Sequence, residues 1–509
     1  MAHLPSRRGG ILKKLLITLA IIIALVVVLV GYEAFLAVTS KPAPTQNYSK
    51  QIHDRALERQ RAHFGGGLNQ WPRFEAAMRE VDKASQWLRE YNEALPSEEK
   101  ASRYNYISFY VLVWPAAEGG TRAQYEVARR RALEVLDYWQ AMGIFDRATD
   151  IAALERVAVP PIDTPTIEMI LPYLGSVRQL ARAHAARMRV AAEAGDDRQF
   201  LTTFEESLAL GRITSGQGFL ISWLVGVAID AMALNQLAEC LLLHPVAEEQ
   251  WLIAADAAIE REQFELYPPL QHVMEDKRLE TADEVQRSFT ASGRFIPLAH
   301  ARLLYANDMT YAPDELLPFG ETRFSNLHAR LFLSRRAADA WLDRATELSI
   351  ISANATGSAS IGADRAVEAF TGDVTWRNPI AEYYSYLGQL ARTERARQIN
   401  AAGTRVILAI ERYRLRNGGA IPQTLDDLGN LLPEALRTDP FTEQPWDYQP
   451  SPVTTRNDGD PLQPGSHAWP YTLRSRPLPG SPPSDTPYPI HPNHGILITT
   501  PIEAPEFDE

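Results

Sequence analysis

Two short patterns in this chain combine residue types that carry out chemistry in other proteins. Ser97 and Lys100 have the Ser-x-x-Lys spacing in which a serine serves as a nucleophile. His491 and His494 are the one close pair among 11 histidines. The serine pattern lacks the companion motifs of its class, and a zinc site needs three or four converging donors. Neither pattern therefore predicts a catalytic or metal site.

Carboxylates gather at three further places. Glu205 with Glu206, and Glu275 with Asp276, lie in helical stretches of ordinary charge patterning, so we expect both pairs on solvated faces. The Asn-Asp-Gly-Asp turn from Asn457 offers fewer oxygens than the six or more that Ca²⁺ takes. Phosphate loops, dinucleotide fingerprints, nucleophile elbows and HExxH motifs are absent from the sequence. We therefore predict no catalytic residue, no metal ligand and no cofactor.

Composition narrows the class of protein. The 509 residues carry a net charge of −12 at pH 7, and no basic cluster follows the N-terminus. Because nucleic-acid binders present a basic face, we predict no nucleic-acid partner. Cys240 is the single cysteine, which rules out an intrachain disulfide. At about 100–200 residues per domain, the length indicates roughly three units.

The elements that position these residues begin with an apolar N-terminal segment. No charged residue occurs from Leu15 to Tyr32, which is about the length that crosses a bilayer as a helix. Four basic residues precede it: Arg7, Arg8, Lys13 and Lys14. By the positive-inside rule we expect a signal-anchor through residues 15–36. The protein would then be single-pass in the cytoplasmic membrane, with the bulk of the chain extracytoplasmic. A cleaved signal peptide, a twin-arginine signal and a type IV prepilin leader are alternatives that fit less well.

A helical body follows the anchor. An alanine-rich helix ends at Gly195-Asp-Asp, and the next helix places Phe200, Phe204 and Leu208 on one face. Such a pair resembles a tetratricopeptide-like hairpin, although no 34-residue period runs along the chain. The pattern predicts a mainly α protein with a large helical array or bundle.

The segment from Gly218 is apolar enough to suggest a second membrane span. Asp230 lies near its middle, and a lone carboxylate at mid-bilayer is costly. We therefore interpret this segment as a buried core helix in which Asp230 caps or pairs inside the protein.

Residues 400–450 show a third kind of pattern. A helix with an apolar face ends at Asn417-Gly-Gly, as glycine at a helix C-terminus indicates. The pieces that follow are Ile421-Pro422, a short helix Leu425–Leu428, Leu432-Pro433, Asp439-Pro440-Phe441 and Pro445-Trp446-Asp447-Tyr448. This order resembles the globular part of the major pseudopilin of type II secretion systems. The resemblance implies a small α+β unit. We expect the helix around Val406–Leu415 to lie across a sheet with Trp446 or Tyr448 against it, and Leu415 in the contact.

The predicted layout covers the whole chain. Its parts are a cytoplasmic N-terminus and anchor (1–40), a linker (41–50), an N-terminal helical region (51–160), a central bundle (161–350), a linker (351–380), the pseudopilin-like helix and start of the sheet (381–450) and a Pro-rich irregular tail with short strands (451–509). This layout is similar to uncharacterised membrane-anchored helical envelope proteins of planctomycete-type bacteria, a family that implies no activity.

Two functions are compatible with these observations. The first is a protein-binding or scaffolding component of the cell envelope with unknown protein partners, linked to secretion through the C-terminal resemblance alone. The second is an envelope hydrolase whose site the sequence does not reveal. A deep pocket with converging His, Asp, Glu or Ser would favour the enzyme. A shallow site without perturbed ionisable groups would favour the binding protein.

The predicted topology can be tested with a reporter that is active only outside the cytoplasm. Fused after Glu509, it should be active, because the basic residues before the anchor hold the N-terminus in the cytoplasm. A reporter that works only in the cytoplasm, fused at the same position, is the control and should be silent. The reverse pattern would overturn the predicted orientation.

Overall fold

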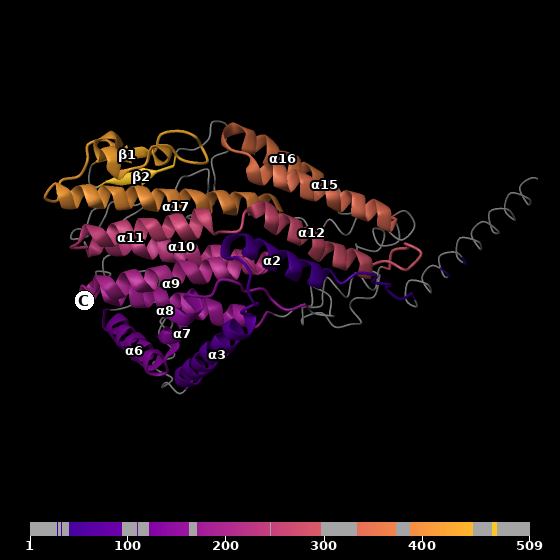
Figure 1. The fold of residues 1–509 in the computed structure, drawn as a ribbon, viewed down its shortest axis with the longest axis horizontal. Coiled ribbons are helices and arrows are strands. Elements are labelled where there is room, and N and C mark those ends of the chain that lie inside the picture. The colour runs from indigo at the N-terminus through magenta and orange to yellow at the C-terminus, as the bar shows by residue number, and fades with distance from the viewer. Residues whose placement is uncertain are drawn as a thin grey trace, which may run out of the picture.

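The structure, a computed structural model, describes residues 40–93, 109, 122–161, 171–244, 246–296, 333–372, 387–450 and 471–475, together with Val28 and Tyr32. The described residues are mainly helical, as predicted (Figure 1). Apart from the exposed residues Val28 and Tyr32, the predicted anchor lies outside the described residues and stays a prediction.

The elements fall into three groups along the chain. The first group is α2 (Tyr48–Phe64), α3 (Trp71–Glu93), α6 (Arg122–Ala141) and α7 (Ile144–Ala152). The second is α8 (Tyr173–Ala194), α9 (Asp197–Ser215), α10 (Leu220–Leu243), α11 (Glu249–Ile259), the π-helix η2 (Glu260–Glu265) and α12 (Leu270–Arg287). The third is α15 (Arg335–Asn354), α16 (Gly357–Gly372), α17 (Leu387–Arg416), the 3₁₀ helices η4 (Leu425–Leu431) and η5 (Glu434–Leu436), and the strands β1 (Asp447–Gln449) and β2 (Thr472–Arg474).

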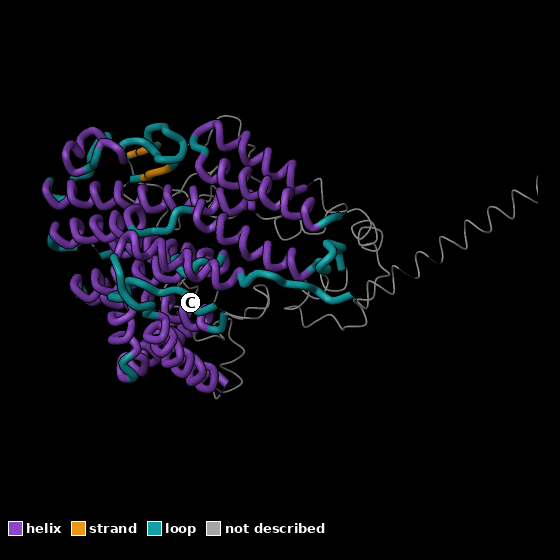
Figure 2. The backbone as a smooth tube through the Cα atoms, turned by 45° about the vertical axis from the view of Figure 1, so that its right-hand side comes forward, coloured by secondary structure: helices purple, strands orange, loops and turns teal. Residues whose placement is uncertain are grey.

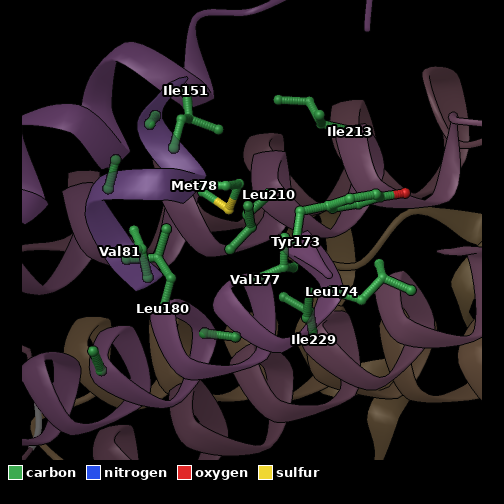
Figure 3. Close-up of a cluster of buried hydrophobic side chains, with 14 of the residues drawn as sticks. Met78, Val81, Ile151, Tyr173, Leu174, Val177, Leu180, Leu210, Ile213 and Ile229 are labelled. Carbon is green, nitrogen blue, oxygen red and sulfur yellow. The ribbon is translucent and has the colours of Figure 1, made fainter. Parts of the chain in front are cut away.

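The long helices form the centre of the molecule. In Figure 1, α8, α9, α10, α11 and α17 run side by side, and α10 contacts both α9 and α17. The helices α3, α6 and α7 lie on one side of this layer, and the strands lie on the other, beyond α17 (Figure 2). Buried side chains of α3, α7, α8, α9 and α10 meet in one hydrophobic cluster (Figure 3).

The predicted hairpin is the pair α8 and α9. Gly195 ends α8 in the left-handed conformation at φ 67°, which favours glycine. The Asp196 side chain then accepts a hydrogen bond of 2.9 Å from the amide of Gln199 and caps α9. Phe200, Phe204 and Leu208 are buried, as their spacing predicts.

The apolar helix α10 is enclosed by other helices. Within the described part of the chain, Leu220–Leu241 is the one stretch long and apolar enough to cross a membrane, and 67% of its most apolar window is buried in the protein. It contacts α8, α9, α12 and α17. This burial supports the interpretation of the segment as a core helix.

The C-terminal elements place two short strands beside α17. The strands β1 and β2 pair antiparallel, with Tyr448 opposite Leu473. Trp446 is buried in one cluster with residues of α17, and its Nε1 donates a hydrogen bond of 2.9 Å to the Leu436 carbonyl. The Tyr448 hydroxyl donates to the Pro422 carbonyl at 2.8 Å. A helix across a small sheet is therefore present, while its kinship with pseudopilins stays a proposal.

Two details of this region were predicted wrongly. Leu415 is 38% exposed, because nine residues at about 100° each place it on the opposite side of α17 from the buried Val406. The stretch 351–380 was expected to be a linker, yet α16 occupies Gly357–Gly372. Alanine favours helix, and an ion pair of 2.7 Å between Asp364 and Arg395 ties α16 to α17. The other predicted domain boundaries remain predictions.

Candidate functional site

A cavity of about 180 Å³ lies where α2, the α9–α10 turn, the segment after η2 and the start of α12 meet. Its buried walls comprise Ala56, Val157, Arg212, Ile213, Ser215, Phe219, Val273 and Asp276. Four of its lining residues are exposed and form the rim: Ala62, His63, Glu155 and Pro269. The cavity is thus open to solvent at the rim and largely apolar inside.

Glycine and proline fix the backbone around this cavity. Gly218 has φ 91°, and a Cβ there would lie 2.8 Å from the Ile52 side chain on α2. Only glycine therefore lets the α9–α10 turn approach α2 this closely. Pro268 and Pro269 separate η2 from α12, which begins at Leu270, and proline suits a helix start because no amide donor is needed there.

One wall of the cavity contains an ion pair between Arg59 of α2 and Asp276 of α12. Arg59 holds Asp276 through two contacts, Nη1 to Oδ2 at 2.5 Å and Nη2 to Oδ1 at 2.9 Å. Burial raises the pKa of Asp276 to about 6, although Arg59 acts to lower it. The expectation that Glu275 and Asp276 lie on a solvated face is wrong for Asp276. Its carboxylate is buried because α2 packs over α12.

A second cation on the wall is also neutralised. The Nε of Arg212 donates a hydrogen bond of 2.5 Å to Glu262 of the π-helix, and both residues are buried. The Arg212 guanidinium lies 5.3 Å from the centre of the Phe64 ring. Burial lowers the pKa of His272, which also lines the cavity, and favours its neutral form.

Beneath the cavity lies a buried polar cluster around Asp230. The Ser215 hydroxyl, on the cavity wall, is 2.6 Å from the Tyr267 hydroxyl. The charge of Arg397 acts to lower the pKa of Asp230, and Gln263 and Tyr267 lie close enough to act in the same direction, but neither oxygen of Asp230 makes a hydrogen bond of good geometry. Burial dominates and raises the pKa of Asp230 to about 8. Asp230 is buried as predicted, but it does not cap a helix or form a hydrogen-bonded pair.

A serine, a histidine and a carboxylate also meet in the interior. Ser207 Oγ lies 3.2 Å from His184 Nδ1, and His184 Nε2 lies 3.9 Å from Glu206 Oε2. These residue types resemble a hydrolase triad. All three side chains are buried between helices and none lines the cavity, while Ser207 donates a hydrogen bond of 2.8 Å to the Thr203 carbonyl. Burial lowers the pKa of His184 to about 3, so its neutral form is retained.

This cluster corrects a second sequence prediction. Glu206 was expected on a solvated face, but α7 covers it, and Thr149 donates a hydrogen bond of 2.5 Å to its carboxylate. His184 could not be singled out from local patterns, because its partners Ser207 and Glu206 lie on a different helix. Cys240 is buried, and burial raises the pKa of its thiol to about 12, so the reactive thiolate is disfavoured.

The remaining sequence candidates are not brought to the cavity by any described contact. Ser97 with Lys100, His491 with His494, and the turn at Asn457 all lie outside the described residues. Among the residues that the structure does describe, no group of three or more His, Cys, Asp or Glu could hold a metal ion. The cavity residues were missed because they come from segments far apart in the chain; only the glycines at 216–218 and the prolines at 268–269 marked its turns.

No protein-family model, no curated protein and no solved structure matches this chain. Its function is therefore inferred from the geometry of the cavity and the features of the sequence.

The buried state of Asp230 predicts a pH dependence of stability. Its carboxyl titrates near 3.8 when unfolded and at about 8 when folded, so the folded state alone holds the proton between these values. Stability then falls as pH rises across this window, by on the order of 1 kcal/mol per pH unit. Asp230→Asn has no titrating carboxyl at this position. The melting temperature of the variant minus that of the natural protein should therefore become steadily more positive from about pH 5 to about pH 8. A constant difference would show that Asp230 is already ionised in the folded protein.

Proposed function

We propose that this chain is a membrane-tethered, extracytoplasmic helical protein that binds other proteins as a scaffold of the cell envelope. The observation that carries this proposal is the cavity, which has an apolar interior, a solvent-exposed rim that includes His63 and Glu155, and charges already held in ion pairs. Apolar pockets with a solvent-accessible rim are typical of the centres of protein interfaces. The cavity face is therefore the proposed contact surface.

The charges in the cavity support binding over catalysis. Arg59 is engaged by Asp276, and Arg212 is engaged by Glu262, which also contacts Arg261. The one serine on the wall, Ser215, contacts the hydroxyl of Tyr267 and makes no described hydrogen bond to a histidine or carboxylate. A catalytic site needs a nucleophile or base within hydrogen-bond reach of a substrate position. His272 and Asp276 line the cavity with shifted pKa values, but no described hydrogen bond joins either residue to Ser215. The described lining residues therefore offer a recognition surface without a paired nucleophile and base.

Anchoring and the link to secretion rest on the sequence. The uncharged run from Leu15 to Tyr32 supports a tether in the cytoplasmic membrane through residues 15–36. The similarity of residues 400–450 to a major pseudopilin supports a partner in a secretion or envelope assembly. The packing of Trp446 against α17 supports that similarity, because such a unit needs a helix over its few strands.

An envelope hydrolase is the second candidate. The contact between Ser207 and His184, with Glu206 nearby, is the observation that favours it. For this set to act, α7 would have to separate from α9 and admit a substrate. The closed packing in the structure favours a structural role for these residues.

The binding proposal can be tested in living cells with a photo-crosslinking amino acid. Placed at Glu155 on the rim, it should yield a discrete crosslinked protein, because a partner on the cavity face covers the rim. The matched control position is Lys83 on α3, which is exposed and away from the cavity lining, and it should yield none.

Equal crosslinking from Glu155 and Lys83, or none from Glu155, would contradict the proposed surface. In the same cells, a serine-reactive fluorophosphonate should leave the protein unlabelled. Labelling that disappears in Ser207→Ala would establish the hydrolase instead.

A further inference from the structure

We propose that the cavity binds one aromatic side chain of the partner polypeptide. This inference rests on the proposed binding function and names the group that the cavity face recognises. Four properties of the cavity lead to it: its volume, its charge balance, the guanidinium groups on its walls and its opening.

Volume sets the size of the occupant. The cavity measures about 180 Å³. An apolar cavity of about 150 Å³ holds one benzene molecule, whereas pockets for drug-sized ligands measure about 300–1,000 Å³. A single ring therefore fits this space, and a nucleotide or a flavin is too large for it.

Existing ion pairs disfavour an ionic occupant. Asp276 is held by Arg59, and Glu262 is held by Arg212 and by the half-exposed Arg261. A charged ligand would have to break one of these buried pairs, and a buried charge left without its partner is strongly unfavourable. The cavity thus suits a neutral group.

The walls favour a ring over an aliphatic group. Phe64 and Phe219 line the cavity, and aromatic pairs gain stabilisation beyond their buried area. Arg59 and Arg212 add two guanidinium groups, and Arg212 already lies over the ring of Phe64. Guanidinium groups attract the face of an aromatic ring and give no such gain to a leucine or valine.

The opening favours a side chain that enters from a polypeptide. Ala62, His63 and Glu155 are exposed at the rim, so a backbone can remain outside while the ring enters. Aromatic residues seated in small desolvated pockets are typical hot spots of protein interfaces. A free aromatic molecule shares the same ring chemistry, and the experiment below separates the two sources.

The test uses the full chain in lipid nanodiscs and fluorine NMR of three probes. They are an acetylated and amidated Gly-(4-fluorophenylalanine)-Gly peptide, the same peptide with 5-fluoroleucine, and fluorobenzene. The fluorophenylalanine signal should broaden with the protein and not with empty nanodiscs, and fluorobenzene should compete with it. The fluoroleucine peptide should bind with at least about tenfold lower affinity, as a ring-selective site requires.

Variants on α2 place the binding at the cavity. Ala62→Trp puts a large ring at the exposed rim, where folding should be unaffected, and should weaken binding of the fluorophenylalanine peptide about tenfold or more. Glu58→Trp is the control, because Glu58 is exposed on the same helix and does not line the cavity. Its affinity should match that of the natural protein, and melting curves of both variants should confirm that they are folded.

Several outcomes would overturn the inference. Equal binding of the leucine peptide would remove the selectivity for a ring, and binding of fluorobenzene alone would assign the cavity to a free small molecule. Absence of binding by both aromatic probes would refute the ring site. If the crosslink at Glu155 persists in that case, the proposed binding function stands and the aromatic anchor alone is wrong. If the probes bind but Glu155 captures no protein, the proposed function fails instead.

Discussion

The close contact between α9 and α10 is the constraint on which the rest of this structure depends. A Cβ at Gly226 would lie 2.5 Å from the carbonyl oxygen of Gly211, and a Cβ at Gly211 would lie 2.7 Å from Cγ of Asp230. Two glycines facing each other therefore set the distance between the helices. That distance buries Asp230, places the turn through Gly218 against α2 and thereby positions the walls of the cavity.

Partly or fully buried ion pairs then fix how the surrounding helices sit on this central pair. Arg59 to Asp276 joins α2 to α12, Arg212 to Glu262 joins α9 to the π-helix, and Arg405 to Asp256 joins α17 to α11 at 2.7 Å. Such pairs contribute little net stability, because their desolvation is costly. Breaking one leaves a buried charge, so each pair opposes misplaced packing more than it strengthens the native state. A π-helix beside the cavity fits this picture, since π-turns redirect side chains and occur frequently at functional sites.

Local patterns predicted the parts of the fold whose causes are local. The end of α8 at Gly195, the buried face of α9 and the burial of α10 could be read from the sequence, because glycine conformation and hydrophobic spacing act over a few residues. The packing of Trp446 on α17 followed from a longer but still contiguous pattern. Leu415 was misplaced because one residue of helical phase moves a side chain by about 100°.

The cavity could not be predicted in the same way. Its residues come from α2, the segment after α7, α9 and α12, and no spacing rule joins Arg59 to Asp276 across the chain. Charge patterning likewise indicated a solvated Glu206, because a sequence does not show that α7 will cover it. The burial of Asp276 and Glu206 follows from the positions of the helices that cover them, which the sequence alone does not show.

The melting temperature of Gly226→Ala tests the central contact most directly. In an exposed helix, this change stabilises a protein by about 1 kcal/mol, because alanine has the higher helix propensity. Packing at Gly226 predicts the opposite sign: the added methyl would collide with the Ser215 side chain and the Gly211 backbone and lower the melting temperature. Gly175→Ala, with open space at its Cβ and a helical position in α8, is the control that should not be destabilised. A stabilised Gly226→Ala variant would show that α9 and α10 are not in this close contact.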